Sequence, residues 1–421
     1  MSALAEVFQP FDVADPFAFY QRARAEATVF YSPELDYWVV LHYEDVLAVL
    51  RDPATFSSEN AQRPFRPPPP AVERILAGGL TAKSGLLGRD PPDHSRLRSF
   101  VNRAFTPRRV AVLEPQIREI AVRMIERMAP RGRGAWVADL AYDLPALVIF
   151  LLLGIPDSDV PNVKTWARSR VQINFGDLPE PDQVEHANNV VAYWRYCEAL
   201  VDERFVQPGD DLPSDLVREY QRGDKSITKD EMAGLVFSQL TAGHETTTGL
   251  LATGFLQLLR NHGQWEALCR DPELIPNAVE ELLRFCTPVL AAKRRVTHAT
   301  TVGDAALPAG ANVLLLLGSA NHDEAVFPEG EGLDVCRPDV SRHLAFGHGI
   351  HFCLGASLAR LEAQVVLREL TARLPHARLV EPQEIQFSRN TTFRSPLQLL
   401  VEWEDTLRQP GAEGHSSMRL T

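Results

Sequence analysis

From about residue 94 to residue 284 the chain is a succession of segments in which apolar residues recur with the period of an amphipathic helix. Connections rich in proline, glycine and acidic residues separate these segments, as at 177–181 and 207–211. Valine, threonine and turn residues over 295–320 indicate short strands, and so does the aromatic and β-branched run at 36–41. The pattern therefore predicts a mainly α-helical protein with small β-sheets, an α+β fold.

The composition indicates one large body. Hydrophobic residues make up 45% and charged residues 23% of the 421 residues, which supplies ample apolar surface for a single core. The length alone would allow about two or three domains, but no fixed-period repeat and no long polar linker divides the chain. We expect one domain over residues 1–408 and a disordered tail at 409–421.

Charge and cysteine usage exclude several classes of protein. The formal net charge of −12 opposes general binding to nucleic acid or to anionic membranes, which carry charge of the same sign. The longest apolar run, 146–153, is far shorter than the roughly 20 residues that cross a bilayer. The five cysteines form no Cys-x-x-Cys pair, and the N-terminus lacks the apolar segment of a secretory signal. These features favour a cytoplasmic protein without a disulfide framework.

One cysteine lies in a setting that favours metal binding. The segment 346–360 reads FGHGIHFCLGASLAR and places Cys353 in a glycine-punctuated loop before an alanine-rich helical run. A thiolate at a helix N-terminus is stabilised by the helix dipole and by backbone N–H groups. Gly347 and Gly355 would let the backbone approach a flat cofactor closely, and Phe346 would pack against the sulfur. From these residues alone, a small buried cysteine without a ligand remains the alternative.

The whole segment resembles the haem-binding loop of the cytochromes P450, Phe-x-x-Gly-x-(His or Arg)-x-Cys-x-Gly. The matching residues are Phe346, Gly349, His351, Cys353 and Gly355. In that family the cysteine thiolate is the axial ligand of haem b and donates electron density that favours O–O cleavage. The resemblance implies the fold of the P450 family, a single large helical domain, with Cys353 as the iron ligand.

A second segment, TAGHETTT at 241–248, places polar residues inside an apolar helical run. A lone threonine there would ordinarily cap a helix or bond to the carbonyl four residues earlier. The order Ala242, Gly243, Glu245, Thr246 resembles the oxygen-binding helix of the same family. The resemblance implies a locally widened helix beside the haem. It also implies that Thr246 hydrogen-bonds dioxygen and that Glu245 brings protons from solvent.

Cationic side chains that suit haem propionates occur at three places. His94 and Arg98 lie four residues apart, on one face of a helix that two prolines open. A solvated basic face is the alternative, but the pair resembles the His-x-x-x-Arg helix of the P450 family, which binds the propionates. Arg295 and His351 are the remaining propionate partners that the resemblance implies, with Arg294 as the alternative register.

Glu281 and Arg284 share one helical face in the segment VEELLRF. Such pairs are usually solvated and worth about 0.2–0.5 kcal/mol. This pair resembles the Glu-x-x-Arg motif of the P450 family, which forms a buried structural network with a later arginine or histidine. We predict that Arg337 completes the network.

The resemblance implies a monooxygenase that activates dioxygen at a cysteine-ligated haem and hydroxylates, epoxidises or O-dealkylates a small to medium hydrophobic molecule. The chain ends soon after the haem segment, so we expect electrons from a separate ferredoxin or flavodoxin with its NAD(P)H-dependent reductase. A candidate docking patch for an acidic carrier consists of Arg96, Arg103, Arg108 and Arg109.

Two other functions stay open. A peroxide-driven haem-thiolate peroxygenase would need no reductase, but such an enzyme can dispense with Glu245 and Thr246. A haem-based sensor without turnover ranks last, because the proton relay is complete. The expected substrate pocket has mainly apolar walls. Its candidate residues are Val236, Val289, Ala292, Thr392 and Phe393.

Overall fold

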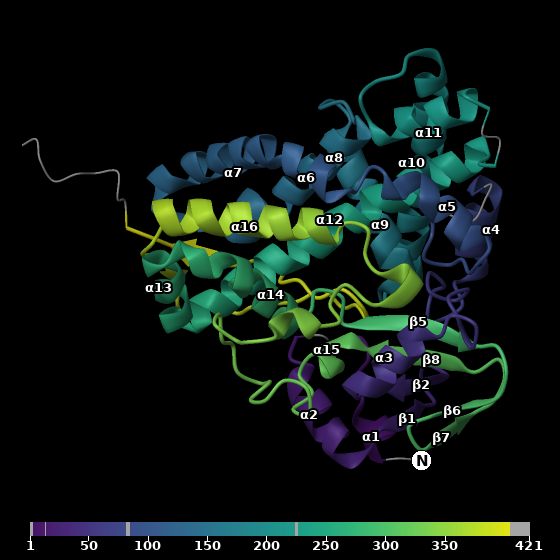
Figure 1. The fold of residues 1–421 in the computed structure, drawn as a ribbon, viewed down its shortest axis with the longest axis horizontal. Helices are drawn as coiled ribbons and strands as arrows, with labels where there is room; N and C mark the ends of the chain where they lie inside the picture. The colour runs from purple at the N-terminus through teal and green to yellow at the C-terminus, as the bar shows by residue number, and fades with distance from the viewer. Residues whose placement is uncertain (1–2, 13, 81–84, 224–225, 405–421) are drawn as a thin grey trace, which may run out of the picture.

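The structure, a computed structural model, describes residues 3–12, 14–80, 85–223 and 226–404. The tail expected at 409–421 lies outside these residues. Figure 1 shows a large helical body, with most of the strands gathered at the end that holds the N-terminus. The prediction of a mainly helical fold with small sheets is confirmed. Within the described part of the chain, no helix combines the length and apolar character that crossing a bilayer demands.

The helices occupy most of the region between residues 93 and 286. Within the described residues they are α1 (Ala3–Val7), α2 (Phe17–Glu26), α3 (Tyr43–Arg51), α4 (Pro70–Gly79), α5 (Asp93–Asn102), α6 (Pro107–Val112), α7 (Glu114–Met128), α8 (Asp143–Leu153), α9 (Val160–Phe175), α10 (Glu180–Val206), α11 (Leu212–Gln221), α12 (Lys229–Arg260), α13 (His262–Arg270), α14 (Ile275–Cys286), α15 (Leu317–Ala320) and α16 (Ala356–Arg373). Many begin with proline in the first turn, where its missing N–H costs no hydrogen bond.

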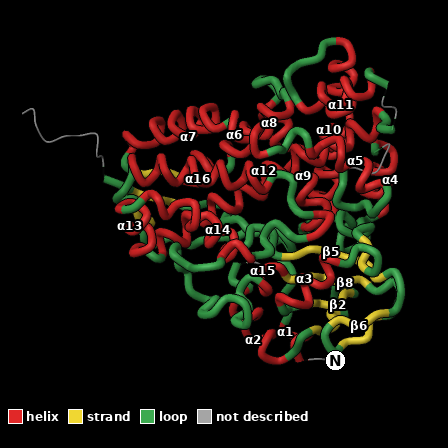
Figure 2. The backbone as a smooth tube through the Cα atoms, in the orientation of Figure 1, coloured by secondary structure: helices red, strands yellow, loops and turns green. Residues whose placement is uncertain are grey.

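The strands form three small sheets. They are β1 (Val29–Ser32), β2 (Tyr37–Val40), β3 (Phe56–Ser57), β4 (Arg133–Ala135), β5 (Ala291–Val296), β6 (Thr300–Val302), β7 (Ala305–Leu307), β8 (Asn312–Leu316), β9 (Arg378–Leu379) and β10 (Leu400–Glu402). The largest sheet has the order β1-β2-β8-β5-β3, in which β2 and β8 are parallel and the other pairs antiparallel. Figure 2 shows this sheet below α9 and α10, with α3 and α15 beside it. Both regions in which the sequence predicts strands contribute to it.

Helix α12 runs through the centre of the molecule (Figure 1). It begins at a capping box, in which Thr228 and Glu231 each accept from the backbone N–H of the other. Helix α8 packs across it, and a Cβ on Gly243 would lie 2.7 Å from Ile149 Cγ1, so only glycine permits this close approach. The local widening expected over 242–246 is wrong: the segment is continuous α-helix.

Candidate functional site

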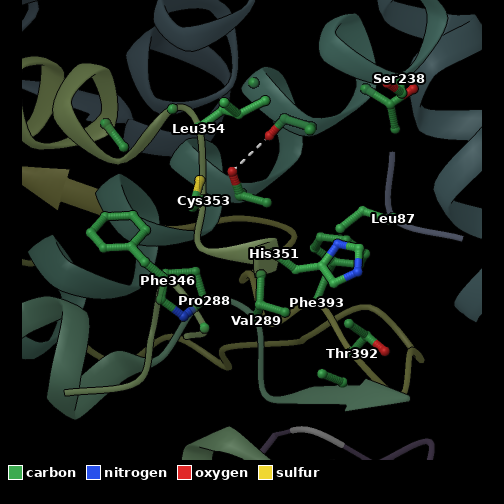
Figure 3. A pocket seen from close by; sticks show the side chains of 18 of the residues that line it. Leu87, Ser238, Pro288, Val289, Phe346, His351, Cys353, Leu354, Thr392 and Phe393 are labelled. Carbon is green, nitrogen blue, oxygen red and sulfur yellow. Dashed lines mark hydrogen bonds between the residues drawn. The ribbon is translucent and has the colours of Figure 1, made fainter. Parts of the chain in front are cut away.

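One interior cavity lies between α12, β5 and the loop that precedes α16. Figure 3 shows Cys353 and His351 among the side chains that surround it. Of the residues singled out from the sequence, its lining contains Arg98, Ala242, Gly243, Thr246, Val289, Ala292, Phe346, Gly347, His351, Cys353, Gly355, Thr392 and Phe393. Segments that are distant in the sequence therefore meet at one cavity.

The loop that carries Cys353 is shaped by its glycines. Gly347 and Gly349 have φ of +65° and +69°, a backbone conformation that glycine adopts without strain. The backbone N–H of Cys353 donates to the carbonyl of Phe346 at 3.0 Å, which closes the loop just before α16. Burial raises the pKa of the Cys353 thiol, while the backbone N–H of Gly355 acts in the opposite direction. A metal ion would supply the positive charge that the thiolate needs.

The residues of the oxygen-binding segment divide between two faces of α12. Thr246 faces the cavity, and its hydroxyl donates to the carbonyl of Ala242 at 2.8 Å. His244 and Glu245 are outside the cavity lining, and the His244 ring packs on Tyr142 at 4.4 Å. Burial raises the pKa of the Glu245 carboxyl to about 7. A carboxyl whose pKa is raised to about 7 is thus the neighbour, along the helix, of the residue that carries the cavity-facing hydroxyl.

Histidine and arginine side chains gather at one edge of the cavity. The rings of His94 and His351 lie 4.3 Å apart, and Arg98 donates to the carbonyl of Ile350 at 2.8 Å. Burial and the neighbouring cations, Arg294 foremost, lower the pKa of His351 to about 3. Both ring nitrogens of His94 are buried and lack a hydrogen-bond partner among the described residues.

These observations fit haem at this site. Buried polar atoms ordinarily have partners, so the orphaned nitrogens of His94 indicate a ligand group that accepts hydrogen bonds. The cluster of His94, Arg98 and His351 suits anionic propionates. The thiol of Cys353 opens onto the same cavity and suits iron.

The expectation that Arg295 binds a propionate does not fit the structure. Successive side chains of a strand point to opposite faces, and Arg295 in β5 turns outward, where it pairs with Glu59 at 3.3 Å. Its neighbour Arg294 is buried and lines the cavity beside His351. Arg294, the alternative to Arg295 in the sequence analysis, is therefore the arginine that lies in the cluster suited to the propionates.

The Arg294 and Arg295 pair gives a matched test of this correction. We expect Arg294→Gln to weaken haem retention about tenfold or more, because a charged hydrogen bond is worth about 1.5–3 kcal/mol. Arg295→Gln is expected to leave retention unchanged. The rate of haem transfer to apomyoglobin measures the difference. Equal rates for the two variants would contradict the assignment.

Val236 does not lie in the cavity wall, where the sequence predicts it. It is fully buried in the main core cluster and lies outside the cavity lining, to which α12 contributes Phe237 and later residues instead. The structure also adds two cations that the expectation of mainly apolar walls missed, Arg170 and Lys293. Strand alternation gives no signal for Lys293, because Ala292, Lys293 and Arg294 all line the cavity.

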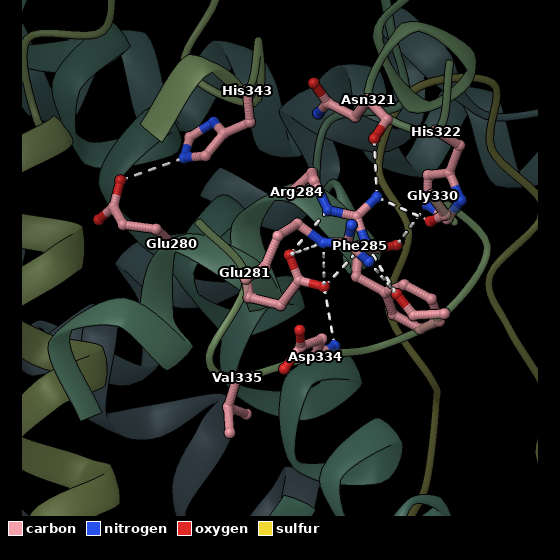
Figure 4. A network of polar contacts seen from close by, with 12 residues as sticks. Glu280, Glu281, Arg284, Phe285, Asn321, His322, Gly330, Asp334, Val335 and His343 are labelled. Atoms are coloured by element: carbon pink, nitrogen blue, oxygen red, sulfur yellow. Dashed lines mark hydrogen bonds and ion pairs between the residues drawn. The ribbon is translucent and has the colours of Figure 1, made fainter. Parts of the chain in front are cut away.

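The Glu281 and Arg284 pair lies outside the cavity and is completely buried (Figure 4). Two hydrogen bonds of 2.7 and 2.8 Å join the two side chains. Arg337 Nε lies 3.2 Å from both carboxylate oxygens of Glu281. The remaining N–H groups of Arg284 donate to backbone carbonyls, those of Asn321, Gly330 and Gly332. The network ties α14 to the segment that follows α15.

Known proteins resemble the chain over nearly its whole length. Residues 269–388 match the family model described as Cytochrome P450. Cytochrome P450 monooxygenase PikC of Streptomyces venezuelae is 38% identical over 93% of this chain and 91% of that protein. Mycinamicin IV hydroxylase/epoxidase of Micromonospora griseorubida is 39% identical over 87% of this chain and 89% of that protein. The solved structure of cytochrome P450 CREJ in complex with (4-ethylphenyl) dihydrogen phosphate has a TM-score of 0.93 and 42% identity, and covers 95% of this chain and 100% of that one. The chain belongs to the cytochrome P450 family, whose members are haem-dependent monooxygenases.

Proposed function

We propose that this P450 monooxygenase holds haem b through Cys353 and oxidises a small to medium molecule with an apolar body. The observation that carries the proposal is the single cavity that joins the Cys353 thiol to the Thr246 hydroxyl. Among the described lining residues Cys353 is the only cysteine, which favours haem b over a form bound through thioethers. All five cysteines are free thiols, in keeping with the cytoplasmic location that we expect.

The haem, when bound, supplies the activation of dioxygen, and the chain supplies binding, orientation and proton transfer. Cys353 would ligate the iron, and the cluster of His94, Arg98, Arg294 and His351 would hold the propionates. The Thr246 hydroxyl would hold a proton at the cavity wall. Glu245 would replenish it, because a carboxyl with a pKa of about 7 exchanges protons readily at neutral pH.

The lining supports a largely apolar substrate. Val289, Ala292 and Phe393 line the cavity together with Phe175 and Phe237. The ligand named for the P450 CREJ structure, an alkyl-substituted phenyl phosphate, is an example of the size that we propose. Hydroxylation or epoxidation, as named for the mycinamicin enzyme, are the reactions that we propose for this chain.

We propose that a separate ferredoxin or flavodoxin, with its NAD(P)H-dependent reductase, delivers the electrons. The arginines considered as its docking patch are mostly paired within the chain. Arg96 pairs with Glu231 at 2.6 Å. Arg103 pairs with Glu219 at 3.1 Å, and Arg109 with Asp215 at 2.6 Å. The group is therefore not a patch of free cations, and the proposed carrier does not depend on it.

The decisive experiment compares electron sources on the purified protein. We expect a strongly red-shifted Soret band after reduction under carbon monoxide, and substrate oxidation driven by NADPH with a surrogate reductase and ferredoxin. Oxidation by hydrogen peroxide alone would favour the peroxygenase. A haem protein that oxidises no substrate by either route would be a sensor.

Replacement of Glu245 by glutamine tests the proton relay. We expect NADPH-driven product formation to fall about 100-fold, the lower end of the usual contribution of a positioned acid or base. Because Glu245 is protonated below its pKa of about 7, the wild-type rate should decline above pH 7, and the variant rate should stay flat. Peroxide-driven turnover serves as the control. An unchanged rate and pH profile would remove Glu245 from the relay.

The same substitution should change the pH dependence of stability. Burial raises the pKa of Glu245 in the folded chain above its ordinary value, so the fold favours the neutral carboxyl. Wild-type stability therefore falls as the pH rises from the ordinary pKa of a glutamate through about 7. Thermal unfolding at pH 6 and pH 8 should show a smaller difference for Glu245→Gln than for the wild type.

A further inference from the structure

A lysine is buried in the wall of the cavity. Lys293 is 3% exposed, and its ammonium donates to the carbonyl of Arg63. The ammonium also lies 4.3 and 4.9 Å from the ring centroids of Phe65 and Phe175. Among the described residues no carboxylate lies within ion-pair distance of it. One carbonyl and two aromatic faces leave an ammonium, which has three donors, without a countercharge.

Such a lysine is costly to keep charged. Burial, and secondarily the charge of Arg170, lowers the pKa of Lys293 to about 7. Charged groups in protein interiors are ordinarily paired. An apolar residue at this position would fill the wall without the cost of desolvation. The lysine is therefore better explained by a partner that the described residues do not provide.

Arg170 in α9 brings a second cation to the same part of the cavity. Its guanidinium donates to Asn174 Oδ1 at 3.2 Å and to Gln62 Oε1 at 3.1 Å. It also lies over the Phe237 ring, 5.2 Å from the centroid. Arg170, Gln62, Asn174 and Lys293 all line the cavity. A polar, cationic end that contains Lys293 and Arg170 is thus built into the cavity, in addition to the cluster of Arg98, Arg294 and His351.

The propionates of haem do not account for this end. The charged neighbours that act on His351 are Arg294, His94 and Arg98, whereas the pKa of Lys293 responds to Arg170. The ammonium of Lys293 contacts the carbonyl of Arg63 and the rings of Phe65 and Phe175, none of which belongs to the cluster around His94 and His351. The two groups of cations are therefore distinct.

No described carboxylate in the cavity wall is a partner for Lys293 either. Among the described lining residues the only carboxylate is Glu362, which α16 places on the side of the cavity that carries Cys353. The ammonium of Lys293 therefore has no carboxylate partner among the described residues that line the cavity.

We propose that the substrate carries an oxyanion head group, which binds between Lys293 and Arg170 while the apolar body lies in the cavity that continues to Cys353. This inference rests on the proposed function. A phosphate monoester and a carboxylate share the required chemistry, because both accept charged hydrogen bonds from ammonium and guanidinium groups. Anchoring the head would fix which carbon of the body faces the haem.

Three probes of equal hydrocarbon size test the proposal: 4-butylphenyl phosphate, 4-butylbenzoate and neutral 4-butylphenol. Binding is measured by calorimetry and by the Soret shift, neither of which requires turnover. We expect the wild type to bind at least one anionic probe about tenfold or more tightly than the phenol. Tight binding of only one anionic probe identifies the head group. If neither is bound more tightly than the phenol, the proposal is wrong.

Substitutions at position 293 test whether Lys293 causes the preference for an anionic probe over the phenol. Lys293→Met should reduce the preference for the anionic probe about tenfold or more and leave phenol binding unchanged, whereas Lys293→Arg keeps the charge and should retain the preference. Arg389→Gln, which removes a surface cation paired with Asp177, is the matched control. The carbon monoxide spectrum and the melting temperature verify that each variant is folded.

The outcomes separate this inference from the proposed function. An unchanged preference in folded Lys293→Met overturns the role of the lysine, even if NADPH-driven oxidation proceeds. Failure of NADPH-driven oxidation would count against the proposed function, but a preference lost in Lys293→Met and kept in Lys293→Arg would still establish the anion site.

Discussion

Replacement of Cys353 by serine is expected to abolish the red-shifted Soret band of the reduced carbon monoxide complex and to reduce NADPH-driven oxidation to background. A serine hydroxyl does not ionise near neutral pH and cannot donate electron density as a thiolate does. The loop itself should persist, because the backbone bond from residue 353 to the carbonyl of Phe346 does not involve the side chain. Absorption spectra and product formation measure the effect.

Cys336 provides the matched control for this experiment. It is an exposed free thiol outside the cavity lining, so Cys336→Ser should keep both the band and the activity. Survival of the red-shifted band in Cys353→Ser would show that another group ligates the iron.

Replacement of Arg284 by leucine is expected to reduce the free energy of unfolding by about 3–5 kcal/mol, the range for breaking a buried ion pair. The change leaves the Glu281 carboxylate buried, with Arg337 as its remaining cationic partner. It also leaves backbone carbonyls, those of Asn321, Gly330 and Gly332, without the donor that they share. Urea denaturation, followed by circular dichroism, measures the loss.

A surface pair of the same chemistry provides the comparison. Arg22 and Glu26 lie 3.8 Å apart on α2, with side chains 54% and 47% exposed. Arg22→Leu should change stability by no more than about 0.5 kcal/mol. Similar losses for the two variants would mean that the buried network contributes no more than a solvated pair.

The sequence predicts the fold class because hydrophobic periodicity is a local signal. The strands expected at 36–41 and within 295–320 were predicted from β-branched runs and turn residues, and the helices from their period. Which residues border the site depends instead on tertiary contacts. Helix α12 is buried on nearly all sides, so its pattern does not reveal that Phe237 faces the cavity and Val236 the core.

In strand β5, too, the sequence pattern alone does not identify the residues that border the site. Side chains of a strand alternate between two faces. The run AAKRRV has cations on both faces, so composition cannot decide whether Arg294 or Arg295 points inward. The pairing of β5 with β8 fixes the register and leaves Arg295 to the surface carboxylate of Glu59. Lys293 was missed for a related reason: a charged residue is expected to be solvated unless a partner is known.

The imidazole of His94 is buried, and neither ring nitrogen has a hydrogen-bond partner among the described residues. The stability of the folded chain should therefore depend on the supply of haem. Each such nitrogen costs the cofactor-free chain about 1–3 kcal/mol, and a ligand that binds only the folded state stabilises that state by mass action. The population of folded chains therefore rises with the concentration of free haem. A cell short of haem would accumulate fewer intact chains at the same rate of synthesis, because the unfolded fraction is open to proteolysis.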